Sequence, residues 1–131
     1  MADYAKLEIR GMYSKDITHS SPRVDFNPAD YTLTPDEYFH CEIQADTSAG
    51  TTITTSILAS ATLLVVKNND DNNYVTATYR QASYSPSAIM DTVSRIAPGG
   101  ILATTDFTVA QNLKLVANSA ACECEIFIVG T

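Results

Sequence analysis

LLVVKNNDDNNYVTATY, residues 63–79, holds two strand-forming runs on either side of a polar tract. The first run, 63–66, is wholly apolar, and the second, 74–79, alternates aromatic and aliphatic residues with Thr76 and Thr78. Apolar and β-branched runs that flank Asn- and Asp-rich turn residues are typical of antiparallel strands. The stretch therefore predicts a β-hairpin with a central first strand, covered on both faces, and a second strand that shows one polar face to water.

Other short runs with strand character occur on both sides of this stretch. Residues 5–13 predict a first strand, and residues 38–45 a second, with Phe39, Cys41 and Ile43 on its apolar face. Later strands are expected within 51–58, 90–96, 101–103, 112–117 and 122–129, and the sequence APGG at 97–100 predicts a type II turn. The composition of residues 56–66, SILASATLLVV, also suits a helix, but the surrounding β-branched residues and the absence of helix caps favour a strand. The pattern predicts an all-β chain: a single β-sandwich or jelly roll of about eight to nine short, mainly antiparallel strands.

Length and composition limit the classes of function. A chain of 131 residues predicts one domain, residues 1–131, and 45% hydrophobic with 18% charged residues argues against disorder. Fifteen acidic against eight basic residues, a net charge of −7, would repel a phosphate backbone, so we expect no nucleic acid partner. No run approaches the ~20 apolar residues of a membrane span, and no signal peptide is recognised. We therefore expect a soluble protein made in the cytoplasm.

Residues 14–35 form a long polar stretch with three prolines and few apolar residues. A long connection without its own core is uncommon in a compact domain unless it is functional or packs on something else. We therefore expect an extended N-terminal arm or wrapping loop whose isolated apolar residues, Val24, Phe26, Tyr31 and Leu33, contact a neighbouring subunit. The alternative is a loop folded over its own sandwich, with a short edge strand at 23–26.

The sequence offers little that could carry catalysis or hold a metal. Three cysteines exclude a complete disulfide framework. Cys122 and Cys124 share a strand face, but their spacing is not that of a zinc knuckle, and Cys41 and His40 fall on opposite faces of their own strand, so we expect buried, reduced thiols rather than a zinc site. The tract 68–73 could supply oxygen ligands to calcium but lacks the spacing of an EF-hand, which favours a hydrated turn. No strained turn presents a nucleophile beside His19 or His40. We assign no catalytic, cofactor-binding or metal-binding residue and expect a non-enzymatic protein.

A carbohydrate-binding module is the main alternative, because sandwiches host such sites and seven tyrosines could supply stacking rings. Tryptophan is absent, however, and tyrosines on strand faces commonly serve sheet or interface packing.

The second half of the chain resembles the small β-sandwich structural proteins of tailed bacteriophage virions. The resemblance covers about residues 63–131 and rests on four features: a strand ending in an Asn/Asp turn, a strand that opens YV, a Pro-Gly-Gly turn, and a final strand shortly after ANS. It implies a virion component, of the head-decoration or cement type, that binds the exterior of the capsid and stabilises capsomer junctions. A tail or head–tail joining role is the alternative within this class.

The resemblance also implies the partners. They are further copies of the chain, in a closed oligomer for which a trimer on a threefold axis is favoured, and the major capsid protein. A protein that binds only the assembled shell stabilises that state by mass action. A cofactor is not implied.

Overall fold

The computed structural model describes residues 5–7, 11–14, 23–26, 31–33, 37–55, 58–81, 91–109 and 112–130. Its contacts divide the chain into two compact units, Met1–Thr34 and Pro35–Thr131. The described residues contain strands and no helix, and therefore no helix long and apolar enough to cross a membrane.

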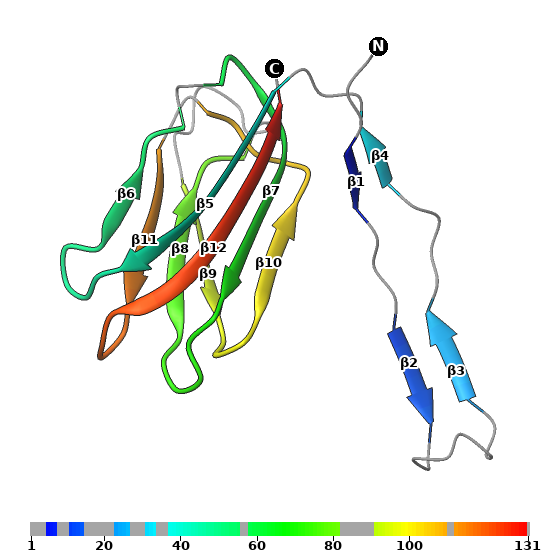
Figure 1. Ribbon diagram of the computed structural model, residues 1–131, viewed down its shortest axis with the longest axis horizontal. Helices are drawn as coiled ribbons and strands as arrows, with labels where there is room; N and C mark the ends of the chain where they lie inside the picture. The colour runs from blue at the N-terminus through cyan, green and yellow to red at the C-terminus, as the bar shows by residue number, and fades with distance from the viewer. Residues whose placement is uncertain are drawn as a thin grey trace. The chain divides into compact units, whose positions relative to one another are not determined.

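The first unit holds four short strands paired in twos. They are β1 (Ala5–Leu7), β2 (Gly11–Ser14), β3 (Arg23–Phe26) and β4 (Tyr31–Leu33). β1 pairs with β4 and β2 with β3, both antiparallel, so the chain goes out along β1 and β2 and returns along β3 and β4 (Figure 1). We call these two strand pairs the ribbon. Of the arm expected over 14–35, Ser14 and the strands β3 and β4 belong to this unit, and the remaining residues lie outside the described part of the structure. The strand expected at 5–13 overlaps the ribbon's first two strands.

The second unit is a β-sandwich of eight strands, as predicted. One sheet has the order β10-β7-β12-β5, and the other has the order β6-β11-β8-β9. Figure 1 shows the two sheets stacked on one another. The strands are β5 (Glu37–Ala45), β6 (Thr51–Ile53), β7 (Ala61–Asn68), β8 (Val75–Tyr79), β9 (Thr92–Ile96), β10 (Ile101–Thr104), β11 (Leu113–Ala117) and β12 (Cys122–Gly130).

Alternation along the strands produces the core, since residues two apart in a strand share a face. In β8, Val75, Ala77 and Tyr79 are buried while the threonines between them are not, as the sequence predicts. The same alternation holds in β11 and through most of β12. The fully or almost fully buried core residues come from both sheets and from 58 and 107: Ala45, Ile53, Leu58, Leu64, Val66, Val75, Ala77, Tyr79, Ile96, Phe107, Leu113, Leu115, Ala117, Cys122, Cys124, Ile126 and Ile128.

The hairpin predicted over 63–79 is wrong. β7 and β8 are consecutive strands, but β7 lies in one sheet and β8 in the other, so the polar tract between them is a crossing connection. The reason is the burial of Asn68, which is 0% exposed. Its amide nitrogen donates to the carbonyl oxygens of Asn73 at 2.8 Å and Ala97 at 3.2 Å, which holds the crossing against the β9–β10 turn.

The turn after β9 has the predicted chemistry but also joins the two sheets. Gly99 has a φ of +68°, and the Gly100 N–H donates to the Ala97 carbonyl at 2.8 Å, as a turn with glycine at its third position requires. β9 and β10, on either side of it, belong to different sheets. Six of the seven connections of the sandwich, all except β8 to β9, therefore pass from one sheet to the other.

Gly130, at the end of β12, is required by a close approach of backbone. The pairing of β12 with β7 shifts by one residue between Val129 and Gly130, which is a β-bulge. A Cβ atom on Gly130 would clash with the backbone carbonyl oxygen of Ser60, and Gly130 has no positive φ. Steric room, and not backbone freedom, selects glycine here.

We predict that Gly130→Ala lowers the free energy of unfolding by about 3 kcal/mol, because backbone must move to admit the methyl group. Gly99→Ala is the control, since nothing lies within 4 Å of its Cβ position and only the left-handed φ of +68° opposes it. We expect that control to cost about 1 kcal/mol. Urea unfolding of both variants measures the difference, and equal costs would contradict the close approach at Ser60.

Candidate functional site

The four residues expected to contact a partner lie in the returning half of the ribbon: Val24 and Phe26 in β3, Tyr31 and Leu33 in β4. The register pairs them in that order with Tyr13, Gly11, Leu7 and Ala5. Their side chains lie outside the described part of the structure, so their contacts stay a prediction. The sequence marked these positions by their isolation but did not indicate that residues 5–14 would pair with them.

The cysteines and His40 lie on opposite faces of one sheet. Cys122 and Cys124 are buried on the core side, and half-buried Cys41 sits opposite Ile126 on that side. His40 is on the outer side, where its Nε2 lies 2.8 Å from Oε1 of Glu125. All three thiols are free; Cys122 and Cys124 are buried as expected, whereas Cys41 is only half-buried. The described residues contain no group of three or more His, Cys, Asp or Glu side chains that could hold a metal ion.

The environment of the thiols disfavours nucleophilic chemistry, which needs the thiolate. Burial raises the pKa of Cys124 to about 11, and the neighbouring Cys122 and Asp70 charges add to the effect. Burial, with a contribution from Asp70, also raises the pKa of Cys122, and burial raises the pKa of Cys41. The described cysteines behave as small apolar residues.

Hydrogen bonds within the tract 68–73 occupy oxygen atoms of Asn68 and Asp70. Oδ1 of Asp70 accepts hydrogen bonds from the backbone N–H of Asn72 at 2.8 Å and of Asn73 at 2.5 Å, and from the Asn73 side chain. Oδ1 of Asn68 accepts from the Asp70 N–H at 3.0 Å. These oxygens are engaged by N–H donors, which supports a structural corner over a cation-binding loop. The hydrogen bonds that Asp70 accepts lower the pKa of its carboxyl group.

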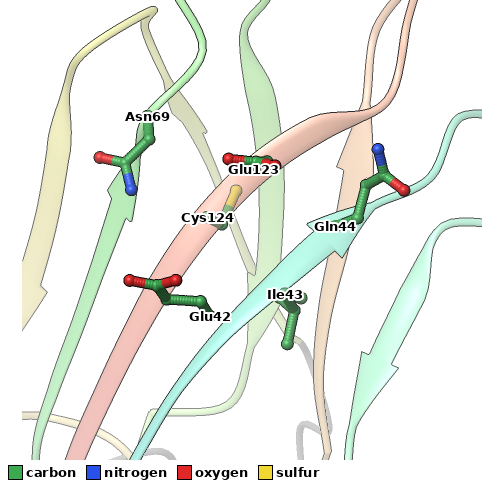
Figure 2. Close-up of a pocket in the computed structure, with 6 residues that line it drawn as sticks. All are labelled: Glu42, Ile43, Gln44, Asn69, Glu123 and Cys124. Atoms are coloured by element: carbon green, nitrogen blue, oxygen red, sulfur yellow. The ribbon is translucent and has the colours of Figure 1, made fainter.

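A shallow polar depression of about 370 Å³ lies where β5, β12 and the end of β7 meet. Figure 2 shows Glu42 projecting from β5 and Glu123 from β12, with Asn69 on the far side. Both charged side chains that line it are carboxylates, so the depression is unsuited to anionic ligands. The described residues bring no third ligand to these two carboxylates.

The tyrosines whose side chains are described offer little to a sugar. Tyr79 is buried and packs against Phe107, with ring centroids 6.4 Å apart. The guanidinium carbon of Arg95 lies 4.1 Å from the centroid of the Tyr74 ring and covers one face of it. Among these three tyrosines, Tyr38 alone is largely exposed, at 72%. An isolated ring gives the glycan-binding alternative weak support, because sugar sites combine stacking with polar groups that converge on one pocket.

We predict that the stabilising effect of Asp70 depends on pH. Its pKa is lowered on folding from 3.8, so its contribution is fully present above that value and is lost as the pH falls through the lower folded-state pKa. Asp70→Asn should therefore be less stable than the parent at neutral pH, and the difference should shrink below about pH 3.8. Urea unfolding from neutral to acid pH checks this, with Asp71→Asn as the neighbouring control. A difference that does not change with pH would contradict it.

We predict that a thiol reagent such as DTNB labels the native protein slowly and only at Cys41, because Cys122 and Cys124 are 0% and 1% exposed. In urea all three cysteines should react at once. Mass spectrometry of the labelled peptides assigns the sites. Rapid native labelling of Cys124 would show that the sheet interior is open to solvent.

No protein-family model, curated protein or solved structure matches this chain.

Proposed function

We propose that the chain is a non-enzymatic structural protein of a tailed-phage virion, a decoration or cement protein that binds the outside of the head and stabilises capsomer junctions. Its partners are further copies of itself, as a trimer, and the major capsid protein. The observation that carries the proposal is the ribbon, two antiparallel strand pairs that lie in a compact unit, Met1–Thr34, separate from that of the sandwich.

The register gives each of the two strand pairs of the ribbon one side that is richer in apolar residues. Because paired residues in antiparallel strands lie on the same face, β1 and β4 gather Ala5, Leu7, Tyr31 and Leu33 on one side and Lys6 and Thr32 on the other. β2 and β3 likewise gather Tyr13, Val24 and Phe26 on one side, and Met12, Ser14, Arg23 and Asp25 on the other. The four predicted contact residues thus belong to the apolar sides.

A two-stranded ribbon is marginally stable in water unless its apolar side is covered. A neighbouring subunit on an assembled shell is a suitable cover, since it presents a fixed, extended surface. A ribbon that binds only there stabilises the assembled state by mass action, with no chemistry required.

The sandwich supports the same class of function. Eight strands in two four-stranded sheets, with six of the seven connections crossing between the sheets, favour a jelly roll over other sandwiches. Jelly rolls form viral capsid and lectin domains. Placement on the head exterior rather than in the tail rests on the sequence resemblance alone, and a tail or head–tail joining protein would use the same ribbon.

We predict that the full chain, at 14.2 kDa per copy, forms a trimer and that residues 35–131 alone are not trimeric. The double variant Tyr31→Ser/Leu33→Ser should weaken the trimer, because it removes apolar groups from the contact face. Thr32→Ser, between them on the other face, should leave it unchanged. Size exclusion with light scattering gives the masses. A trimer that persists without the ribbon would contradict the proposed contact.

The role on the head has its own test. Heads assembled with the protein should rupture at a higher temperature than heads assembled without it, and the ribbon double variant should lose this effect. Immunogold labelling on tails instead of heads would move the protein to the alternative within this class.

A further inference from the structure

β5 is the one long open edge of the sandwich within the described strands. It has nine residues and pairs on one side with β12, whereas the other edge strands, β6, β9 and β10, have three, five and four. Proteins limit unwanted pairing at sheet edges with short strands, lysine or proline. The β5 sequence, EYFHCEIQA, contains neither residue. This edge is therefore suited to accept another strand.

Two hydrogen bonds show which backbone groups of β5 face outward. The carbonyl of Glu123 accepts from the Asn69 N–H at 2.8 Å and so faces the β7 side of β12. Because backbone groups alternate in direction along a strand, the even-numbered residues of β12 face β5, and they pair with Phe39, Cys41 and Ile43.

The residues between these three must then direct their N–H and C=O groups away from β12. In agreement, the Gln44 carbonyl accepts from the Thr51 hydroxyl at 2.9 Å on that outer side. For Tyr38, His40 and Glu42, the described structure contains no backbone hydrogen bond on that side. They present alternating donors and acceptors, which is what an added strand requires.

The side chains at this edge are also incompletely covered. Phe39, Cys41 and Ile43 pack against the core but remain half-buried, whereas Ile126 and Ile128 of the adjacent β12 are 0% exposed. On the outer face, half-exposed His40 uses Nε2 for Glu125. Nδ1 can donate to a second carboxylate when the imidazole carries both protons.

We propose that two copies of this chain pair through their β5 edges, antiparallel about a twofold axis at Cys41. This register places His40 opposite the partner's Glu42, and Glu42 opposite the partner's His40. On the core side it places Phe39 opposite the partner's Ile43, apolar against apolar. The occupant of the edge is thus a second copy.

Charge selects this register from its neighbours. Moving the twofold axis by one residue along β5 in either direction, which shifts the register by two residues, places Glu42 opposite the partner's Glu42, or His40 opposite the partner's His40. Directly opposed like charges destabilise a strand pair, whereas opposite charges stabilise it. In the chosen register each His40–Glu42 pair exchanges two backbone hydrogen bonds, about four in all.

The contact is short, so the isolated dimer should be weak and should form at high micromolar concentration. When many copies are held on one shell, the effective concentration of neighbouring β5 edges is high, and weak contacts of this kind become stronger. A twofold contact also adds to a ribbon-mediated threefold contact, since the two together generate a dihedral or lattice arrangement. The edge pairing does not rest on the virion role.

Cross-linking of the full chain tests the register. Cys41 and the partner's Cys41 would form a non-hydrogen-bonded pair with Cα atoms about 4.5 Å apart, within the range that a disulfide spans. Diamide, which takes up the two protons and two electrons released, should convert the protein to a covalent dimer joined at Cys41. Cys41→Ser should give none, and buried Cys122 and Cys124 should stay reduced in the same peptide map.

Charge variants test the pairing without the oxidant. His40→Glu or Glu42→Lys places like charges opposite each other twice, and should weaken the dimer about tenfold in sedimentation equilibrium. The double variant His40→Glu/Glu42→Lys should restore it. Lys114→Glu, an exposed charge reversal on the other sheet, is the control and should have no effect.

Two results would overturn the proposal. One is a monomer throughout the high micromolar range with no Cys41 cross-link. The other is a cross-link that forms equally in Glu42→Lys, which would indicate random collision. Because the described core lies within residues 45–128, the chain 35–131 should also cross-link. If only chains with the ribbon do so, the contact belongs to the ribbon and the edge pairing is wrong, whatever the fate of the proposed trimer.

Discussion

The buried amide of Asn68 is the interaction on which the sandwich depends. It lies where β7 leaves one sheet, and it binds the crossing to β8 and the turn between β9 and β10. A buried amide without partners would destabilise the fold, so the side chain fixes both crossings together. Backbone hydrogen bonds join the same segments, from Asn68 to Gly100 and from Gly99 to Asp70, each at 3.0 Å. One polar corner at Asn68 therefore ties the crossing from β7 to β8 to the turn between β9 and β10.

Much of the fold could be predicted from local pattern, and the pairing could not. Period-two alternation located β5, β8, β11 and β12 and their buried faces, because it depends only on neighbours in sequence. The 63–79 hairpin failed because Asn and Asp favour turns in hairpins and in crossings alike. Six residues separate β7 from β8, more than the two to five of most hairpin loops, and that length was the available warning. The burial of Asn68 depends on the distant segment at 96–97, which local pattern does not show.

The residues expected to contact a partner were also predictable only in part: the sequence indicated their positions but not their arrangement. Isolated apolar residues among prolines marked Val24, Phe26, Tyr31 and Leu33, and the strands β3 and β4 contain them. That Tyr31 and Leu33 share a side with Ala5 and Leu7, and Val24 and Phe26 a side with Tyr13, follows from the register of each strand pair, which joins residues about ten to thirty apart. The open edge of β5 was equally hidden, because a strand becomes an edge only through the pairing of all the others. The sequence predicted a half-exposed strand at residues 38–45, and the topology places this strand, β5, at the open edge of its sheet.

The central claim is that the sandwich is a self-sufficient scaffold which meets its partners through the ribbon and through the β5 edge. Amide hydrogen exchange of the full chain, followed residue by residue by NMR from dilute to concentrated solution, tests the edge most directly. The amides of Phe39, Cys41 and Ile43, bound to β12, should be protected at every concentration. Those of His40 and Glu42 should exchange rapidly in dilute protein and become protected as it is concentrated. Protection of His40 and Glu42 at the lowest concentration, or rapid exchange at the highest, would contradict the account.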